Sequence, residues 1–278
     1  MLYLVWAILC SVGLSLIMRL GVERVKNNIT MLAVSYLSCT LLGLLHTLSG
    51  GARLYGEGMG TTVLLSMIAG VLLLAGFVFL QWNVHVNGVV LSGVFSKLGV
   101  LVPTAVSIVR FGERPALMQI IGFVLAVAAI LLIDLEKSGT KAGSRLALLL
   151  LLLTNGSCDA MSKVYEELGS ADLQECYLLL SFFAAFLLSL LLAVCKKQGV
   201  ALADVGWGLL LGVPNYYCSR FLIKALGTVP AVAAYPTYSV GTIVVLTAAG
   251  VMLFHERITA RQKLAMVIIL AALVLLNM

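Results

Sequence analysis

The sequence contains few charged residues. Asp, Glu, Lys and Arg make up 11% of its 278 residues, apolar residues make up 62%, and the mean hydropathy is +1.10. A soluble domain has roughly 25% charged residues and is about half apolar. The composition therefore excludes a water-soluble globular protein and predicts an integral membrane protein.

Signatures of other protein classes are also missing. The apolar runs are continuous, whereas a transmembrane β-barrel needs an alternating pattern. No C-x-x-C pair occurs, and the six cysteines lie within or beside apolar runs, which indicates packing residues rather than a disulfide framework. The first segment, MLYLVWAILCSVGLSLIM, lacks a basic n-region and a small-residue cleavage site. We interpret it as a first membrane span and not as a signal peptide.

No enzyme signature is present. His255 and Glu256 are not followed by the second histidine of an H-E-x-x-H zinc helix, and neither a G-x-S-x-G motif nor a Gly-rich phosphate loop occurs. We therefore expect no enzyme, no cofactor and no metal. The net charge of +6 lies mostly in loops, where it orients a membrane protein, so we expect no nucleic-acid partner.

Ten apolar runs follow one another along the chain. A membrane span takes about 20 residues, so the length of the chain fits ten transmembrane helices with short loops. The runs are 2–19, 29–49, 61–82, 88–110, 116–134, 145–165, 174–195, 203–225, 229–253 and 259–277.

The two halves of the chain are related. A shift of 143 residues places Phe111, Glu113, Arg114 and Gln119 on Phe254, Glu256, Arg257 and Gln262. The first spans match with a one-residue slip. Five spans per half invert the second half relative to the first, which is the plan of many secondary transporters. The expected fold is an all-α integral membrane protein with two inverted five-helix repeats, 1–137 and 143–278, around a central cavity.

An ionisable residue inside a predicted span is costly and indicates function by default, and four places in the chain qualify as candidates. Lys97 lies about ten residues into the fourth span, before Pro103. It either faces a central cavity, where it binds an anionic group or senses a coupled protonation, or it pairs with a carboxylate or with carbonyls near Pro103. Asp159 shares a helical stripe with Asn155 and Lys163. It either couples protons or binds an amine, or forms an i, i+4 pair with Lys163.

The eighth span carries a second polar face. Tyr216, Arg220 and Lys224 recur at i, i+4 and i+8, with Asn215 beside them. The Arg220 guanidinium either clamps a carboxylate or phosphate in a fork, or ties helices together through carbonyls.

Two weaker candidates complete the set. The segment 81–87, QWNVHVN, is polar and favours an interfacial turn with an aromatic anchor, although Asn83 remains a candidate for binding. In the ninth span, Tyr238 either lines a pocket or packs between helices.

These features together resemble the drug/metabolite transporter superfamily, EamA-like branch. The likeness covers the whole chain and includes the segments Ser96–Pro103 and Asn215–Leu226. It implies a helical basket that works by alternating access. It also assigns Glu113, Arg114, Glu256 and Arg257 to a helix-start motif, for which we expect a structural role.

The leading hypothesis is a secondary transporter of a small polar organic metabolite across the plasma membrane. Within the predicted spans, the two deep positive charges of Lys97 and Arg220 exceed the one deep negative charge of Asp159. This balance favours an anionic or zwitterionic solute. The alternative is a non-transporting membrane receptor or assembly partner. The lipid bilayer is a partner in either case, and a coupling proton and a homodimer stay open.

The loop cations predict the orientation. The loops after the first, fifth, seventh and ninth spans hold most Lys and Arg residues, whereas Arg53 and Arg114 lie on the other side. The positive-inside rule places the richer side in the cytoplasm and both termini outside. Characterised ten-span members of the superfamily usually have both termini in the cytoplasm, so the loop charges depart from the family here. A reporter fused after Met278 is expected to give an extracytoplasmic signal, and a cytoplasmic signal would contradict this orientation.

Overall fold

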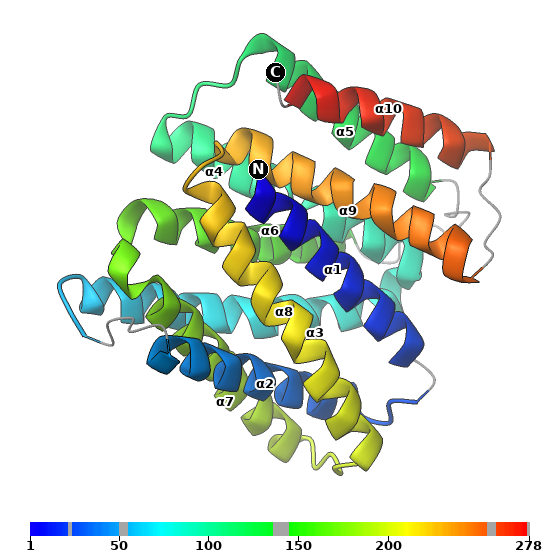
Figure 1. Cartoon of the computed structure of the whole chain (residues 1–278). Coiled ribbons are helices and arrows are strands. Elements are labelled where there is room, and N and C mark those ends of the chain that lie inside the picture. The colour runs from blue at the N-terminus through cyan, green and yellow to red at the C-terminus, as the bar shows by residue number, and fades with distance from the viewer. Residues whose placement is uncertain (22–23, 50–54, 136–144, 255–259, 277–278) are drawn as a thin grey trace. The chain divides into compact units, whose positions relative to one another are not determined.

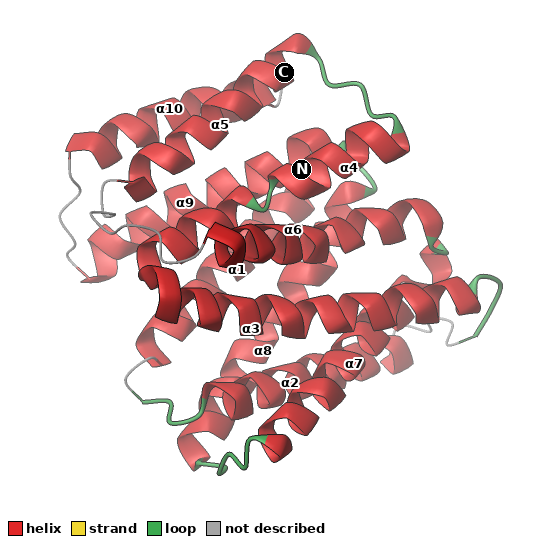
Figure 2. Cartoon of the chain, turned by 180° about the vertical axis from the view of Figure 1, so that it is seen from behind, coloured by secondary structure: helices red, strands yellow, loops and turns green. Residues whose placement is uncertain are grey.

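The structure, a computed structural model, describes residues 1–21, 24–49, 55–135, 145–254 and 260–276 (Figure 1). Every regular element in these ranges is helical (Figure 2), which confirms the all-α prediction for this part of the chain. The elements are α1 (Leu2–Gly21), α2 (Asn28–Ser49), α3 (Met59–Leu98), α4 (Leu101–Phe111), α5 (Leu117–Leu135), α6 (Arg145–Leu168), η1 (Ala171–Leu173), α7 (Gln174–Cys195), α8 (Leu202–Leu226), α9 (Ala231–Phe254) and α10 (Ala260–Leu276).

Four helical segments are long and apolar enough to cross a membrane. They are Asn28–Ser49, Met59–Asn87, Ala171–Cys195 and Ala231–Gly250. Three further apolar helical segments are shorter: Leu2–Met18, Leu101–Phe111 and Leu117–Ala128. The described part of the chain is therefore helical and contains four segments that could cross a membrane by their length and composition.

The prediction of an interfacial turn within residues 81–87 is wrong, because this segment lies inside α3. The side chains of Asn83 and Asn87 are buried. Asn83 Nδ2 donates to the carbonyls of Phe79 and Ala147, and Asn87 Nδ2 donates to Asn83 Oδ1. Polar groups satisfied in this way do not need an interfacial turn.

The helix break occurs instead between α3 and α4. Gly99 lies there, and a Cβ atom on Gly99 would come within 3.1 Å of the Gly156 nitrogen on α6. Pro103 follows in the first turn of α4, where the missing N–H costs nothing because that position has no helical acceptor. Close backbone contact and a helix-starting proline together explain the break at this position.

The chain forms two compact units. The first unit contains residues 1, 75–163 and 225–278, and the second contains residues 2–74 and 164–224. Each unit combines helices from both sequence halves. A sequence repeat need not coincide with a compact unit, so the two five-helix repeats stay a prediction.

In the first unit, α5 packs along α10 (Figures 1 and 2). A Cβ atom on Gly122 would lie 3.0 Å from the Ala272 carbonyl oxygen, so the two backbones approach closely there. Ala126, Val240 and Ala272 form a buried apolar cluster between α5, α9 and α10. Small residues thus allow these helices to pack tightly.

In the second unit, α2 packs along α7 and also contacts α8. The α8 surface facing α2 contains Gly208 and Gly212, a G-x-x-x-G pair that brings helix backbones close together. Ser38 Oγ donates to the Leu209 carbonyl at 3.2 Å, and Cys39 Sγ donates to the Gly212 carbonyl at 3.2 Å. Without side chains on the two glycines, α2 can reach these carbonyls of α8.

Gly212→Ala is expected to destabilise the second unit. Its Cβ would lie 2.5 Å from the Ser35 carbonyl oxygen, so α2 and α8 would have to separate. Such overpacking costs about 1–3 kcal/mol, which exceeds the gain of about 1 kcal/mol in helix propensity. Thermal unfolding in detergent measures the effect.

Gly206→Ala is the matched control on the same helix. No atom lies within 4 Å of its added Cβ, so only the propensity gain remains. Equal melting temperatures for the two variants would contradict the close α2–α8 contact.

Candidate functional site

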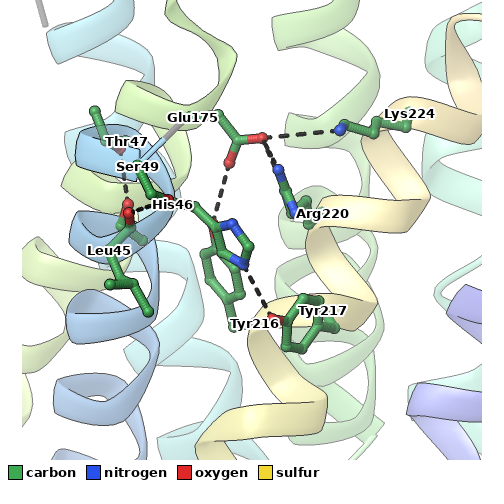
Figure 3. A network of polar contacts seen from close by, with 10 residues as sticks. Leu45, His46, Thr47, Ser49, Glu175, Tyr216, Tyr217, Arg220 and Lys224 are labelled. Carbon is green, nitrogen blue, oxygen red and sulfur yellow. Dashed lines mark hydrogen bonds and ion pairs between the residues drawn. The ribbon is translucent and has the colours of Figure 1, made fainter. Parts of the chain in front are cut away.

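Six polar and aromatic side chains gather in the second unit, and we call them the Glu175 cluster (Figure 3). They come from the last turn of α2, the first turn of α7 and the second half of α8. The members are His46, Glu175, Tyr216, Tyr217, Arg220 and Lys224.

Helix geometry explains how these residues meet. Tyr216, Arg220 and Lys224 recur every four residues and therefore share one face of α8. Glu175 lies in the first turn of α7, where a carboxylate is favoured by the unpaired N–H groups of the helix start. The face of α8 and the start of α7 thus bring two cations to one carboxylate.

The two oxygens of Glu175 have different partners. Oε1 accepts from Arg220 Nε at 2.8 Å and lies 2.7 Å from Arg220 Nη2. Oε2 accepts from the Tyr216 hydroxyl at 3.0 Å. Lys224 Nζ lies 3.9 Å from Oε1, too far for a hydrogen bond but close enough for electrostatic attraction.

Aromatic rings border the charged groups. The His46 ring stacks on Tyr216 with centroids 5.7 Å apart and an interplanar angle of 9°. His46 Nε2 and the Tyr217 hydroxyl form a hydrogen bond of 3.0 Å. Tyr217 stacks in turn on Phe221. These contacts limit the rotation of Tyr216, whose hydroxyl holds the carboxylate.

The cluster is partly open to solvent and has an excess of positive charge. The side chains of Glu175, Arg220 and Lys224 are 15%, 19% and 32% exposed. Two cations face one carboxylate, which leaves one positive charge for a further anion. The arrangement can therefore bind anions. No group of three or more His, Cys, Asp or Glu side chains suited to a metal occurs in the part of the chain that the structure describes.

A second carboxylate, Glu113, has a different environment in the first unit. It follows Gly112, which ends α4 in a left-handed conformation with φ of +68°. The Glu113 oxygens accept from the backbone nitrogens of Ala231 and Val232 at 3.1 and 3.0 Å. Lys163 Nζ lies 3.2 Å from Oε1 and is 5% exposed. Glu113 thus caps α9 and balances a buried lysine.

Other predicted binding residues of the first unit form hydrogen bonds between or within helices. Asn155 Nδ2 on α6 donates to Ser96 Oγ on α3 at 2.7 Å. The Asp159 carbonyl accepts from the Tyr235 hydroxyl of α9 at 2.8 Å. The Tyr238 carbonyl accepts from Thr242 Oγ1 within α9.

The predicted site residues fall into both units. The structure brings Tyr216 and Arg220 together in the second unit, and Asn215 lies one residue before Tyr216 on α8. Asn83, Asn155, Asp159 and Tyr238 belong to the first unit. Arg114 is exposed. The side chain of Lys97 lies outside the described part, as do Glu256 and Arg257.

Sequence reasoning missed Glu175 and His46. Glu175 begins an apolar run, where a carboxylate is ordinary for a helix start. His46 lies near the end of another run. The one signal available was the unpaired cationic face of α8, which required a carboxylate from elsewhere in the chain.

Comparisons with known proteins support the fold. No family model matches the chain. An uncharacterized protein of Haemophilus influenzae is 26% identical over 286 residues, which cover 97% of this chain and 95% of that protein. A crystal structure that carries no functional description matches with a TM-score of 0.78 at 15% identity, over 99% of this chain and 94% of that chain. This likeness shows a shared fold.

Glu113→Ala is expected to destabilise the first unit. It removes the acceptor of two α9 nitrogens and a carboxylate partner of the buried Lys163. Loss of one partner of a buried ion pair costs about 3–5 kcal/mol. Thermal unfolding in detergent measures the loss.

Arg114→Ala is the control from the same sequence motif. Its side chain is exposed, so the expected change is within about 0.5 kcal/mol. A similar loss of stability in both variants would show that the contacts of Glu113 do not cause the destabilisation.

Proposed function

We propose that this protein is a secondary transporter that moves a small polar organic metabolite across the plasma membrane by alternating access. In this proposal it has ten transmembrane helices, arranged as two inverted five-helix repeats (1–137 and 143–278) around a central cavity. The resemblance to EamA-like members of the drug/metabolite transporter superfamily supports the proposal. The proposed transport mechanism includes no catalytic step and no cofactor.

The observation that carries this function is the Glu175 cluster. Charged side chains are rare in apolar helices, and they mark solute or ion pathways when they occur there. Two of the helices that bear the cluster, α2 and α7, are long and apolar enough to cross a membrane. Its charged side chains are 15–32% exposed and are therefore not sealed inside the protein.

The charges favour an anionic or zwitterionic solute. Arg220 and Lys224 together exceed the single negative charge of Glu175. A guanidinium binds a carboxylate through two parallel hydrogen bonds, which gives orientation as well as affinity. The proposed substrate-binding residues are Lys97, Asn83, Asn155, Asp159, Asn215, Tyr216, Arg220 and Tyr238.

A ligand screen with the purified protein tests this function. A bound solute stabilises the folded protein by mass action, by about 2.7 kcal/mol when the free solute concentration is a hundred times Kd. The melting temperature rises accordingly. We expect organic acids or amino acids to stabilise the protein, and the same compounds to cross the membrane of proteoliposomes. Arg220→Ala and Lys97→Ala are expected to abolish the flux, whereas Lys196→Ala, an exposed lysine after α7, is expected to keep it.

The alternative outcomes are distinct. Stabilisation by a solute without flux would favour a membrane receptor over a transporter. Wild-type flux in Arg220→Ala would remove the Glu175 cluster from the transport site. Stabilisation by amines or sugars alone would overturn the anionic preference.

A further inference from the structure

The Glu175 carboxylate occupies the position that an anionic ligand of Arg220 would need. We propose that Glu175 is an internal substitute for a carboxylate-bearing substrate, which displaces it from Arg220 as Glu175 takes up one proton. This inference rests on the proposed transport function and assigns its substrate class and its coupling ion.

The geometry of Arg220 supports an exchange of partners. Two guanidinium nitrogens, Nε and Nη2, both bind one oxygen, Glu175 Oε1. The other oxygen is held by Tyr216. The fork in which each nitrogen binds its own oxygen is the stronger arrangement, and Glu175 does not form it. An incoming carboxylate can form this fork once Glu175 withdraws.

Lys224 makes the site more attractive to a second anion. Its ammonium group lies 3.9 Å from Glu175, and no closer acceptor is found among the described residues. It is also the most exposed of the three charged groups, at 32%. Its hydrogen-bond donors are therefore available to a substrate carboxylate that lies against Arg220.

Charge balance explains the proton. A second carboxylate beside an ionised Glu175 would place two like charges within a few ångströms of each other, which disfavours the ionised form of one of them. If Glu175 takes a proton from solvent as the substrate binds, one negative charge replaces another and the net charge of the cluster is unchanged. No covalent bond changes, and the proton returns to solvent when the substrate leaves.

Other charged and titratable groups of the cluster lie beside Glu175. Arg220 and Lys224 stay charged, and Tyr216 donates its hydroxyl hydrogen to Glu175 Oε2. His46 of α2 stacks on Tyr216 and is the imidazole of the cluster, a type of side chain that commonly exchanges a proton near neutral pH. A test must therefore separate a proton on Glu175 from a proton on His46.

The consequence for transport is that the transported anion and proton together carry no net charge. One monocarboxylate and one proton enter the site together, so their movement across the membrane transfers no net charge. Binding that takes up one proton becomes about tenfold tighter for each pH unit of acidification.

The experiment measures binding of acetate, lactate, benzoate and inorganic phosphate to the full-length protein in detergent. Calorimetry between about pH 6 and about pH 8, in two buffers with different ionisation enthalpies, gives both the affinity and the protons taken up. For the wild type we expect a carboxylate to bind with about one proton and to show the tenfold slope. Phosphate separates recognition of a carboxylate from recognition of any anion.

Glu175→Gln is the decisive variant. The amide keeps the size of the side chain but removes its charge, so carboxylates are expected to bind more tightly near pH 8, without proton uptake and without the slope. Glu57→Gln, an exposed carboxylate before α3, is the matched control and keeps the slope. His46→Gln is expected to keep it as well.

Three results would overturn the inference. They are a slope that persists in Glu175→Gln, a slope lost in His46→Gln, and no binding of any carboxylate to Glu175→Gln at millimolar concentration. Preferential binding of phosphate would also overturn the carboxylate assignment. Flux in proteoliposomes keeps the two proposals apart. If Glu175→Gln still transports the solute and its flux still depends on pH, the proposed transport function stands and the role of Glu175 is rejected. If the wild type binds a carboxylate together with a proton but shows no flux, the transport function is rejected and the role of Glu175 stands.

Discussion

A charge among apolar helices is stable only beside an opposite charge and with its hydrogen bonds made. Glu113 and Glu175 meet this requirement for Lys163 and Arg220. Each carboxylate lies at the end of a helix and joins elements that are distant in the sequence. Much of the packing of the polar residues in each unit follows from this constraint.

The two carboxylates differ in what surrounds them. Both Glu113 oxygens bind backbone nitrogens of α9, and its cation is almost fully buried. A ligand could replace Glu113 only by breaking the cap of a helix. Glu175 instead binds side chains alone, faces two cations and reaches solvent. Side-chain partners can be exchanged without a change in the backbone, which is why only Glu175 suits a binding role.

Much of the fold could be predicted from the sequence, because continuous apolar runs leave helices as the only economical way to satisfy the backbone. Pro103 indicates a helix irregularity from the sequence alone, but the position of the break at Gly99 also depends on contact with Gly156 of another helix. The polar segment around Asn83 resembled a turn for the same reason: its partner, the Ala147 carbonyl, is distant in the sequence. Within the candidate site, the cationic face of α8 was visible as a helical period, but Glu175 resembled an ordinary helix start.

The contacts of Glu113 also bear on how the first and second halves of the sequence combine. Glu113 belongs to the first half, whereas its partners Lys163, Ala231 and Val232 belong to the second. In the other unit, α2 from the first half packs along α7 from the second. A single half would leave Lys163 without this carboxylate and would expose the apolar face of α2. Each compact unit therefore combines helices from both halves of the sequence, and neither half alone would complete its core.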